Sequence, residues 1–172
     1  MRRKARFSTI LVSALVTTAA LADEFPPRKP GLWEVKVEGE KRPTVTLKMC
    51  IDKDTDELFH KMGVDLSVQL CEHRDVKVVD NVATVDTQCK IGSSNVTSTS
   101  ITKFDGDTAF HVDTKSHFDP AFMGRSDLVS VQNGKWVGPC PADMEPGDML
   151  MGSGIKVNIK MLNALKKILP KK

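Results

Sequence analysis

Short runs in which apolar and polar residues alternate constrain the fold of this chain more than any other feature. Two such runs cover residues 33–38 and 44–50, and a turn-rich segment at 39–43 separates them. Successive side chains of a strand point to opposite faces of a sheet. Each run therefore predicts a strand with one buried and one solvated face.

Three further pairs of runs flank short turn segments, which is the pattern of β-hairpins. The pairs are 76–79 with 82–89 around Asp80-Asn81, 96–104 with 108–118 around Asp105-Gly106-Asp107, and 128–132 with 135–137 around Asn133-Gly134. Asn-Gly is the strongest two-residue hairpin signal among them. We expect a mainly β fold, a strongly curved antiparallel sheet or small barrel built of hairpins.

Two segments carry helical patterns instead. Residues 54–62 begin with acidic residues, end near Lys61 and are followed by Gly63, as in a short helix. Near the C-terminus, apolar residues recur at helical spacing. They are Ile155, Ile159, Leu162, Leu165 and Leu169. We expect a C-terminal amphipathic helix there.

The first 22 residues have the composition of an export signal. Four basic residues precede an uncharged run at 7–21, and Ala20-Leu21-Ala22 forms a small-x-small cleavage motif. The run is shorter than the roughly 20 residues that a spanning helix needs, which favours a cleaved signal peptide over a permanent anchor. We expect a periplasmic protein that begins at Asp23.

The expected periplasmic location determines how the four cysteines are interpreted. In an oxidising compartment an even number predicts two disulfides, with three connectivities open. With the turn at Asp80-Asn81, Cys71 and Cys89 lie within one residue of being cross-strand neighbours, and one bulge brings them opposite. This favours Cys71–Cys89 with Cys50–Cys140. The wide spacing argues against a zinc site made of cysteines.

Charge and motifs exclude some classes of function. Without the signal segment the chain holds 21 basic and 22 acidic residues, so the near-neutral balance gives no sign of nucleic-acid binding. Neither G-x-S-x-G nor H-E-x-x-H occurs, no residues suggest a catalytic group or a cofactor, and we expect no enzyme.

Two groups of residues are candidate metal ligands. His111, Asp113 and His117 share one face of a predicted strand, where two imidazoles and a carboxylate suit copper or zinc. Lys115 lies between them, so a solvated outer face explains the same pattern. Three methionines after Cys140 suit Cu(I) but equally serve as gap-fillers in a core. They are Met144, Met149 and Met151.

The basic tail, residues 151–172, has two interpretations. From residue 155 to the end it holds six lysines and no acidic residue. It either packs its apolar stripe, including Leu162, on the sheet, or binds an anionic membrane or a partner. In the second case the contacts are Lys156, Lys160, Lys166 and Lys167 with Leu162. We favour packing.

Several short motifs in their order resemble a known family. Pro30-Gly31-Leu32-Trp33-Glu34-Val35 follows the signal, one cysteine ends the next strand and two more bracket a hairpin. Phe104-Asp105-Gly106-Asp107 and Trp136-Val137-Gly138-Pro139-Cys140 follow. Over residues 29–141 the chain resembles a bacterial family of small exported proteins classed as a domain of unknown function. The resemblance implies a periplasmic protein of a Gram-negative bacterium and supplies no catalytic or binding residues.

We expect a signal peptide at 1–22, an exported all-β domain at 23–150 and the basic tail at 151–172. The leading hypothesis is a non-enzymatic binding or envelope-associated module for a small hydrophobic ligand, because a curved sheet offers an apolar concavity. The alternatives are a structural or interaction protein that uses its tail, and a copper or zinc protein.

Overall fold

One curved antiparallel sheet organises the computed structural model, which describes residues 25–40 and 42–168. Across these residues it holds nine strands and two helices. In chain order they are β1 (Gly31–Gly39), β2 (Val45–Ile51), α1 (Lys53–Leu70), β3 (Cys71–Val79), β4 (Val82–Ile91), β5 (Ser94–Asp105), β6 (Ala109–Phe122), β7 (Arg125–Gly138), β8 (Asp148–Met151), β9 (Lys156–Asn158) and α2 (Ile159–Ile168).

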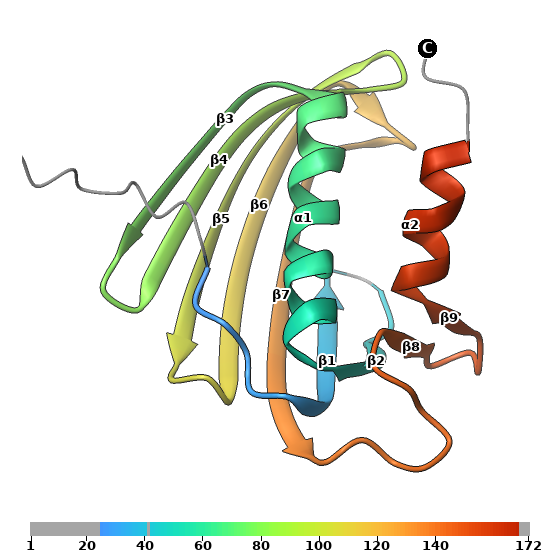
Figure 1. Ribbon diagram of the computed structural model, residues 1–172. Helices are drawn as coiled ribbons and strands as arrows, with labels where there is room; N and C mark the ends of the chain where they lie inside the picture. The colour runs from blue at the N-terminus through green and yellow to red at the C-terminus, as the bar shows by residue number, and fades with distance from the viewer. Residues whose placement is uncertain (1–24, 41, 169–172) are drawn as a thin grey trace, which may run out of the picture.

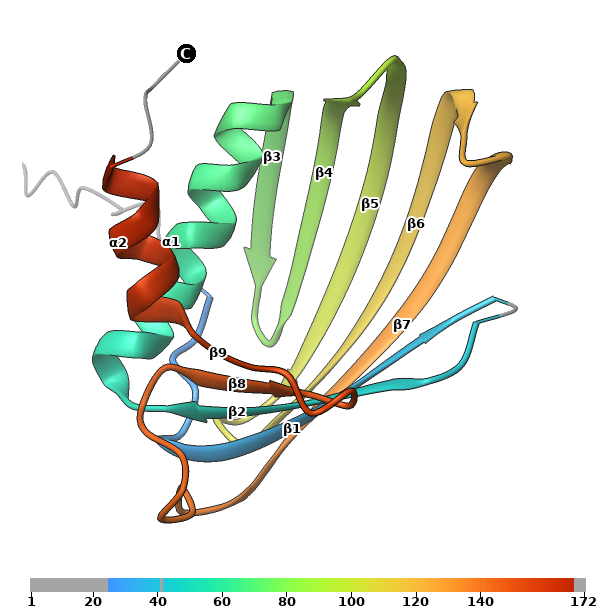
Figure 2. The same cartoon turned by 90° about the vertical axis from the view of Figure 1, so that its right-hand side faces the viewer.

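The strand order is β3-β4-β5-β6-β7-β1-β2-β8-β9, and every neighbouring pair is antiparallel. Hairpins join β3 through β7, and β1 then lies between β7 and β2. The sheet curls into a half-barrel, with α1 across its concave side and α2 beside α1 (Figures 1 and 2). The expected curved sheet is confirmed. Among the described residues β3 and β9 do not pair, so the barrel stays open.

The core lies where β1 and β2 face α1. Trp33 and Val35 of β1 and Met49 and Ile51 of β2 are buried, and Phe59 of α1 packs against them. These side chains occupy alternate positions of their strands, so they share the concave face. The predicted alternation of residues 33–38 and 44–50 therefore marks the two central strands of the core.

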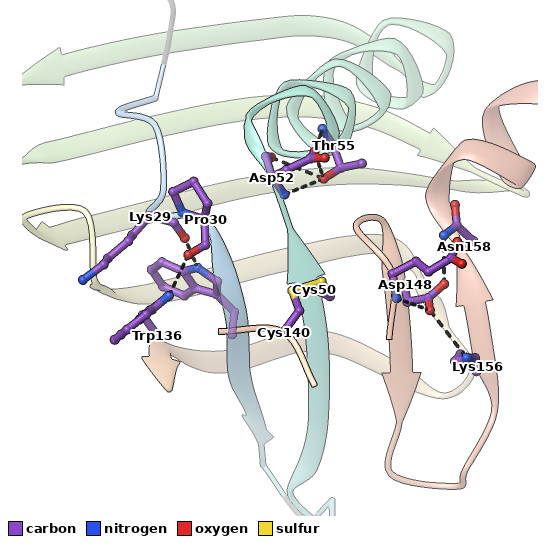
Figure 3. Close-up of a disulfide and its surroundings, with 12 residues drawn as sticks. Lys29, Pro30, Cys50, Asp52, Thr55, Trp136, Cys140, Asp148, Lys156 and Asn158 are labelled. Carbon is purple, nitrogen blue, oxygen red and sulfur yellow. Dashed lines mark hydrogen bonds and ion pairs between the residues drawn. A yellow bond between two sulfur atoms is a disulfide. The ribbon is translucent and has the colours of Figure 1, made fainter. Parts of the chain in front are cut away.

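Helix α1 begins at a capping box. Thr55 N donates to Asp52 Oδ1 at 2.8 Å, and Asp52 N donates to Thr55 Oγ1 at 2.9 Å (Figure 3). This satisfies two N–H groups that a helix start otherwise leaves unpaired. The helix expected at 54–62 is confirmed, but it continues past Gly63 to Leu70, where Cys71 leads directly into β3.

Two disulfides hold both ends of α1. Cys50 lies just before its N-cap and bonds Cys140, and Cys71 lies just after its last turn and bonds Cys89. This is the predicted pairing. Val79 faces Val82 across the Asp80-Asn81 turn, and an irregularity near Cys71 supplies the one-residue shift that the pairing needs. Two disulfides are consistent with an exported protein. The expected signal peptide lies outside the described residues.

The hairpin turn predicted at Asn133-Gly134 is wrong. Both residues lie inside β7, where Gly134 pairs with Val35 on one side and Phe110 on the other. A Cβ at position 134 would overlap the ring of Phe110. The glycine therefore provides room for an aromatic ring rather than the positive φ of a turn.

The C-terminal region differs from one continuous helix. Residues before Ile159 form the short strands β8 and β9, which extend the sheet beyond β2. Ile155 is exposed and does not join an apolar stripe, whereas Ile159 is buried at the start of α2. Helix α2 packs against α1 and not on the sheet face. Leu169 lies outside the described residues. No helix in the described part of the chain is long and apolar enough to cross a membrane.

Candidate functional site

A pocket of about 290 Å³ lies on the concave side, between the sheet, α1 and residues 25–28. Its walls come from segments far apart in the chain, and most are aromatic or aliphatic. The apolar lining residues are Phe25, Pro26, Met49, Phe59, Phe104, Phe110 and Val112, and the polar ones are Arg28, His60 and Thr102. Apolar walls with few polar groups are typical of small-molecule sites.

Ring contacts give the pocket its shape. The Phe25 ring stacks on His60 with centroids 5.6 Å apart and lies 6.0 Å from the ring of Phe104. Phe110 stacks on Trp33 of the core at 5.8 Å. Such pairs stabilise each other beyond their burial alone. The N-terminal segment thus forms one wall, and the strands form the opposite one.

A buried ion pair lies at the polar end of the pocket. The Asp56 side chain is only 4% exposed, and its Oδ1 lies 2.7 Å from both Nε and Nη2 of Arg28. The backbone N–H of Arg28 donates to Asp56 Oδ2 at 2.9 Å, and His60 Nε2 lies 3.6 Å from Oδ1. A buried carboxylate needs such partners. This ion pair anchors residues 25–28 to the first turn of α1.

Two tryptophans fix the chain just after that anchor. Trp33 Nε1 donates to the carbonyl of Lys29, and Trp136 Nε1 donates to the carbonyl of Pro30, both at 2.9 Å (the second in Figure 3). Lys29 Nζ lies 3.9 Å from the centre of the Trp136 ring, a cation–π contact. At Gly31, φ is +133° and an added Cβ would overlap the carbonyl of Gly138. The two tryptophan motifs of the sequence therefore meet and position the pocket wall.

The predicted tail residues are partly used in structural contacts. Lys156 Nζ bonds the Asp143 carbonyl at 3.0 Å and lies 3.5 Å from Asp148 Oδ2 (Figure 3). Lys160 is exposed and Leu162 is half-buried. The side chains of Lys166 and Lys167 lie outside the described residues. Lys156 is therefore part of a local ion pair, not a free basic contact.

Asp148 is the centre of this local network. Burial by itself raises its pKa, but hydrogen bonds from Glu145 N–H and Asn158 and the charge of Lys156 outweigh burial and lower the pKa overall. A buried carboxylate whose charged form is this well satisfied holds the segment after Cys140 against β9.

The histidine candidates do not converge. His111 lies 2.7 Å from Asn133 and 3.2 Å from Asp113, whereas His117 lies 2.9 Å from Asp127. Six residues along one strand separate the two imidazoles by about 20 Å. No group of three or more His, Cys, Asp or Glu residues within the described ranges could hold a metal ion. The structure therefore does not bring the predicted copper or zinc ligands His111, Asp113 and His117 together in one site.

Two of the three methionines after Cys140 are part of the protein interior. Met144 is buried, and Met149 packs on the core opposite Met49. Met151, at the end of β8, is exposed. The gap-filling interpretation fits the first two methionines, whose side chains are used in packing.

Three other hollows, of about 410, 440 and 520 Å³, are larger than the aromatic pocket. Each is lined by several charged side chains, including Glu34 and Lys103 in the first, Lys115 in the second and Asp143 in the third. Exposed charged walls retain water, so the smaller pocket with apolar walls is the better candidate for a ligand.

Sequence reasoning missed the pocket residues themselves. Phe25 and Arg28 lie in a segment that has the composition of an extended lead-in, and His60 lies in a short predicted helix. The one sequence feature that could have indicated these pocket residues is the presence of two phenylalanines, Phe25 and Phe59, outside the predicted strands. Only the fold brings them together.

Comparisons with curated proteins and with solved structures find no match. Residues 28–140 match a family described as "Protein of unknown function (DUF3617)". This range begins at the arginine of the buried ion pair and ends at the cysteine of the longer disulfide loop. It includes both tryptophan motifs and all strands from β1 to β7. The chain belongs to the DUF3617 family.

Proposed function

We propose that the protein is a non-enzymatic binding module that holds a small hydrophobic ligand in the concave pocket. The observation that carries this proposal is the apolar pocket of about 290 Å³ between the sheet, α1 and the N-terminal segment. The volume is near the lower end of the range for small-molecule sites. A ligand there would be mostly apolar, with any polar group directed to Arg28 and His60.

Rigid walls support the proposal, because a pre-formed site avoids the entropic cost of ordering on binding. Disulfides fix both ends of α1, and the Arg28–Asp56 ion pair fixes the N-terminal wall.

A pair of neighbouring substitutions tests the site. Thr102 lines the pocket, whereas Ile101 points to the opposite face and is 38% exposed. Thr102→Phe fills the pocket and is expected to weaken binding of an apolar naphthylamine dye about tenfold or more, because a ring replaces the space for the ligand. Ile101→Phe is the matched control and is expected to bind the dye as the unaltered protein does.

Fluorescence titration measures both affinities, and thermal unfolding confirms that both variants fold. Equal dye binding by the Thr102→Phe variant and the unaltered protein would show that the pocket is not the site. Native mass spectrometry of protein taken from its own cells would identify a co-purified ligand.

Export to the periplasm is part of the same proposal. The basic and apolar N-terminal segment supports it, and the two disulfides are consistent with it. N-terminal sequencing of the periplasmic fraction is expected to begin at Asp23. An intact N-terminus on a membrane-bound form would contradict this.

A second candidate function is contact with a membrane or a partner through the tail. The observation that favours it is that Met161 and Leu165 of α2 are exposed beside Lys160. Binding to anionic vesicles that is lost when Lys166 and Lys167 are both changed to glutamine would support this role.

A further inference from the structure

We propose that one end of the half-barrel docks on the surface of an anionic lipid bilayer. This end, called here the apolar end, consists of the last turns of α1, the β4–β5 turn and the β6–β7 turn. The proposal concerns a surface separate from the concave pocket and does not require that the pocket bind a ligand.

The apolar end gathers exposed apolar side chains from three separate segments. They are Leu66, Val68 and Leu70 of α1, Ile91 at the end of β4, and Phe122 and Met123 at the β6–β7 turn. Val68 is 70% exposed and Met123 is 84% exposed. Figures 1 and 2 both show the C-terminal end of α1 and these two turns at the same end of the sheet. Exposed apolar groups gathered in this way mark an interaction site.

The opposite end of the same sheet has a different composition. Its turns, β3–β4 and β5–β6, carry Asp80, Asp105 and Asp107 and no basic residue. Its exposed large apolar residues are Val79 beside the β3–β4 turn and Val137 near the end of β7. The turns at both ends connect neighbouring antiparallel strands. This connection does not require exposed apolar side chains, so their concentration at one end points to a role other than folding.

The charge of the β4–β5 and β6–β7 turns supports an anionic surface as the partner. Lys90 precedes Ile91, and Arg125 follows Met123 after one glycine, whereas residues 90–94 and 121–125 hold no acidic residue. The nearest carboxylates in sequence are Asp65 near the end of α1, Glu72 at the start of β3, and Asp119 and Asp127 along β6 and β7 behind the β6–β7 turn, so the basic character is confined to the two turns. Lysine and arginine beside apolar residues reach lipid headgroups while their neighbours enter the apolar layer.

Met123 offers a substitution that keeps the backbone. Its φ is +50°, a left-handed conformation that asparagine tolerates better than most residues. Met123→Asn therefore removes an apolar side chain from the turn without a new backbone strain. Ile91→Ser removes a second one from the neighbouring turn, and Val79→Ser is the matched control at the opposite end.

The experiment is co-sedimentation of the full-length exported protein with vesicles of phosphatidylglycerol and phosphatidylethanolamine, and with vesicles of phosphatidylcholine alone. We expect binding to the anionic vesicles that weakens as salt is added. Met123→Asn is expected to weaken it about tenfold, as loss of one buried apolar side chain does. Ile91→Ser is expected to act in the same direction, and Val79→Ser is expected to have no effect.

Several results would overturn the proposal. They are no binding to anionic vesicles, equal binding by Met123→Asn and Val79→Ser, or loss of binding only when Lys166 and Lys167 are changed, which would assign the contact to the tail. A concentration-dependent dimer, seen by analytical ultracentrifugation and abolished by Met123→Asn, would instead assign this end to a second copy of the chain.

Discussion

Replacement of Gly134 by alanine tests whether this glycine exists to make room for Phe110. The new Cβ would overlap the Phe110 ring, which must then move from its stack on Trp33. Overpacking costs about 1–3 kcal/mol, and the gain from removing a glycine inside a strand offsets about 0.5–1 kcal/mol of it. These ranges give a net loss in the free energy of unfolding of about 0–2.5 kcal/mol, centred on about 1 kcal/mol. At the centre of that range, Tm falls by about 2–4 °C in a domain of this size.

Gly39→Ala is the matched control. Gly39 also lies in a strand, but an added Cβ there meets only Val129 O at 3.7 Å and Arg42 Cδ at 3.8 Å, which is ordinary contact. Its expected effect on the unfolding free energy, measured by urea denaturation, is neutral or slightly stabilising.

A double-mutant cycle separates close packing from a turn. Phe110→Leu relieves the overlap, so it should cost less in the Gly134→Ala variant than in the unaltered protein, with a coupling energy of about 1 kcal/mol. If residues 133 and 134 formed a turn, Gly134→Ala would destabilise through its backbone, whatever side chain stands at position 110. Additive effects, or a Gly134→Ala variant as stable as Gly39→Ala, would refute the packing argument.

Three further predictions concern stability. The Cys50–Cys140 and Cys71–Cys89 bonds span 90 and 18 residues. From the entropy of closing loops of these lengths, the two bonds are expected to stabilise the fold by about 4.6 and about 3.2 kcal/mol, so Cys140→Ser should lower Tm more than Cys71→Ser. Leu162→Asp should reduce the unfolding free energy by about 1–3 kcal/mol if α2 stays packed on α1, and an unchanged Tm would show that it does not. The hydrogen bond from the Thr55 side chain lowers the pKa of Asp52, and the pKa of Asp148 is also lowered. Both carboxylates therefore stabilise the fold above their unfolded pKa of about 3.9 and lose this effect as pH falls through their folded pKa, so Tm should fall below about pH 4 and less so in Asp148→Asn.

Local patterns predicted a large part of this fold. Alternation identified the strands of the central sheet, since a strand with one buried face must place its apolar residues at every second position. The Asp80-Asn81 turn set a hairpin register that placed Cys71 opposite Cys89, and two cysteines then remained for the other bond. These features depend on neighbours in sequence, which is why the residues alone were enough.

Other features depend on contacts between distant segments. Gly134 follows an asparagine, so it looks like a turn residue, and only its position beside Phe110 in the assembled sheet shows why it must be small. Likewise the apolar pattern after Ile155 fits a helix, but residues 156–158 form β9, which pairs with β8 and through it joins the sheet beyond β2.

The pocket is the clearest example of a feature that depends on contacts between distant segments. It needs Phe25 from the N-terminal segment, Phe59 from α1 and Phe110 from β6, and no local pattern links these three rings. The sequence alone predicted which residues form most of the strands, favoured the cysteine pairing that the structure has, and showed that the N-terminus has the composition of an export signal. Tertiary structure decided that the barrel stays open, where α1 crosses it and which side chains meet in the hollow, because strand order and curvature arise from pairings between residues far apart in the chain.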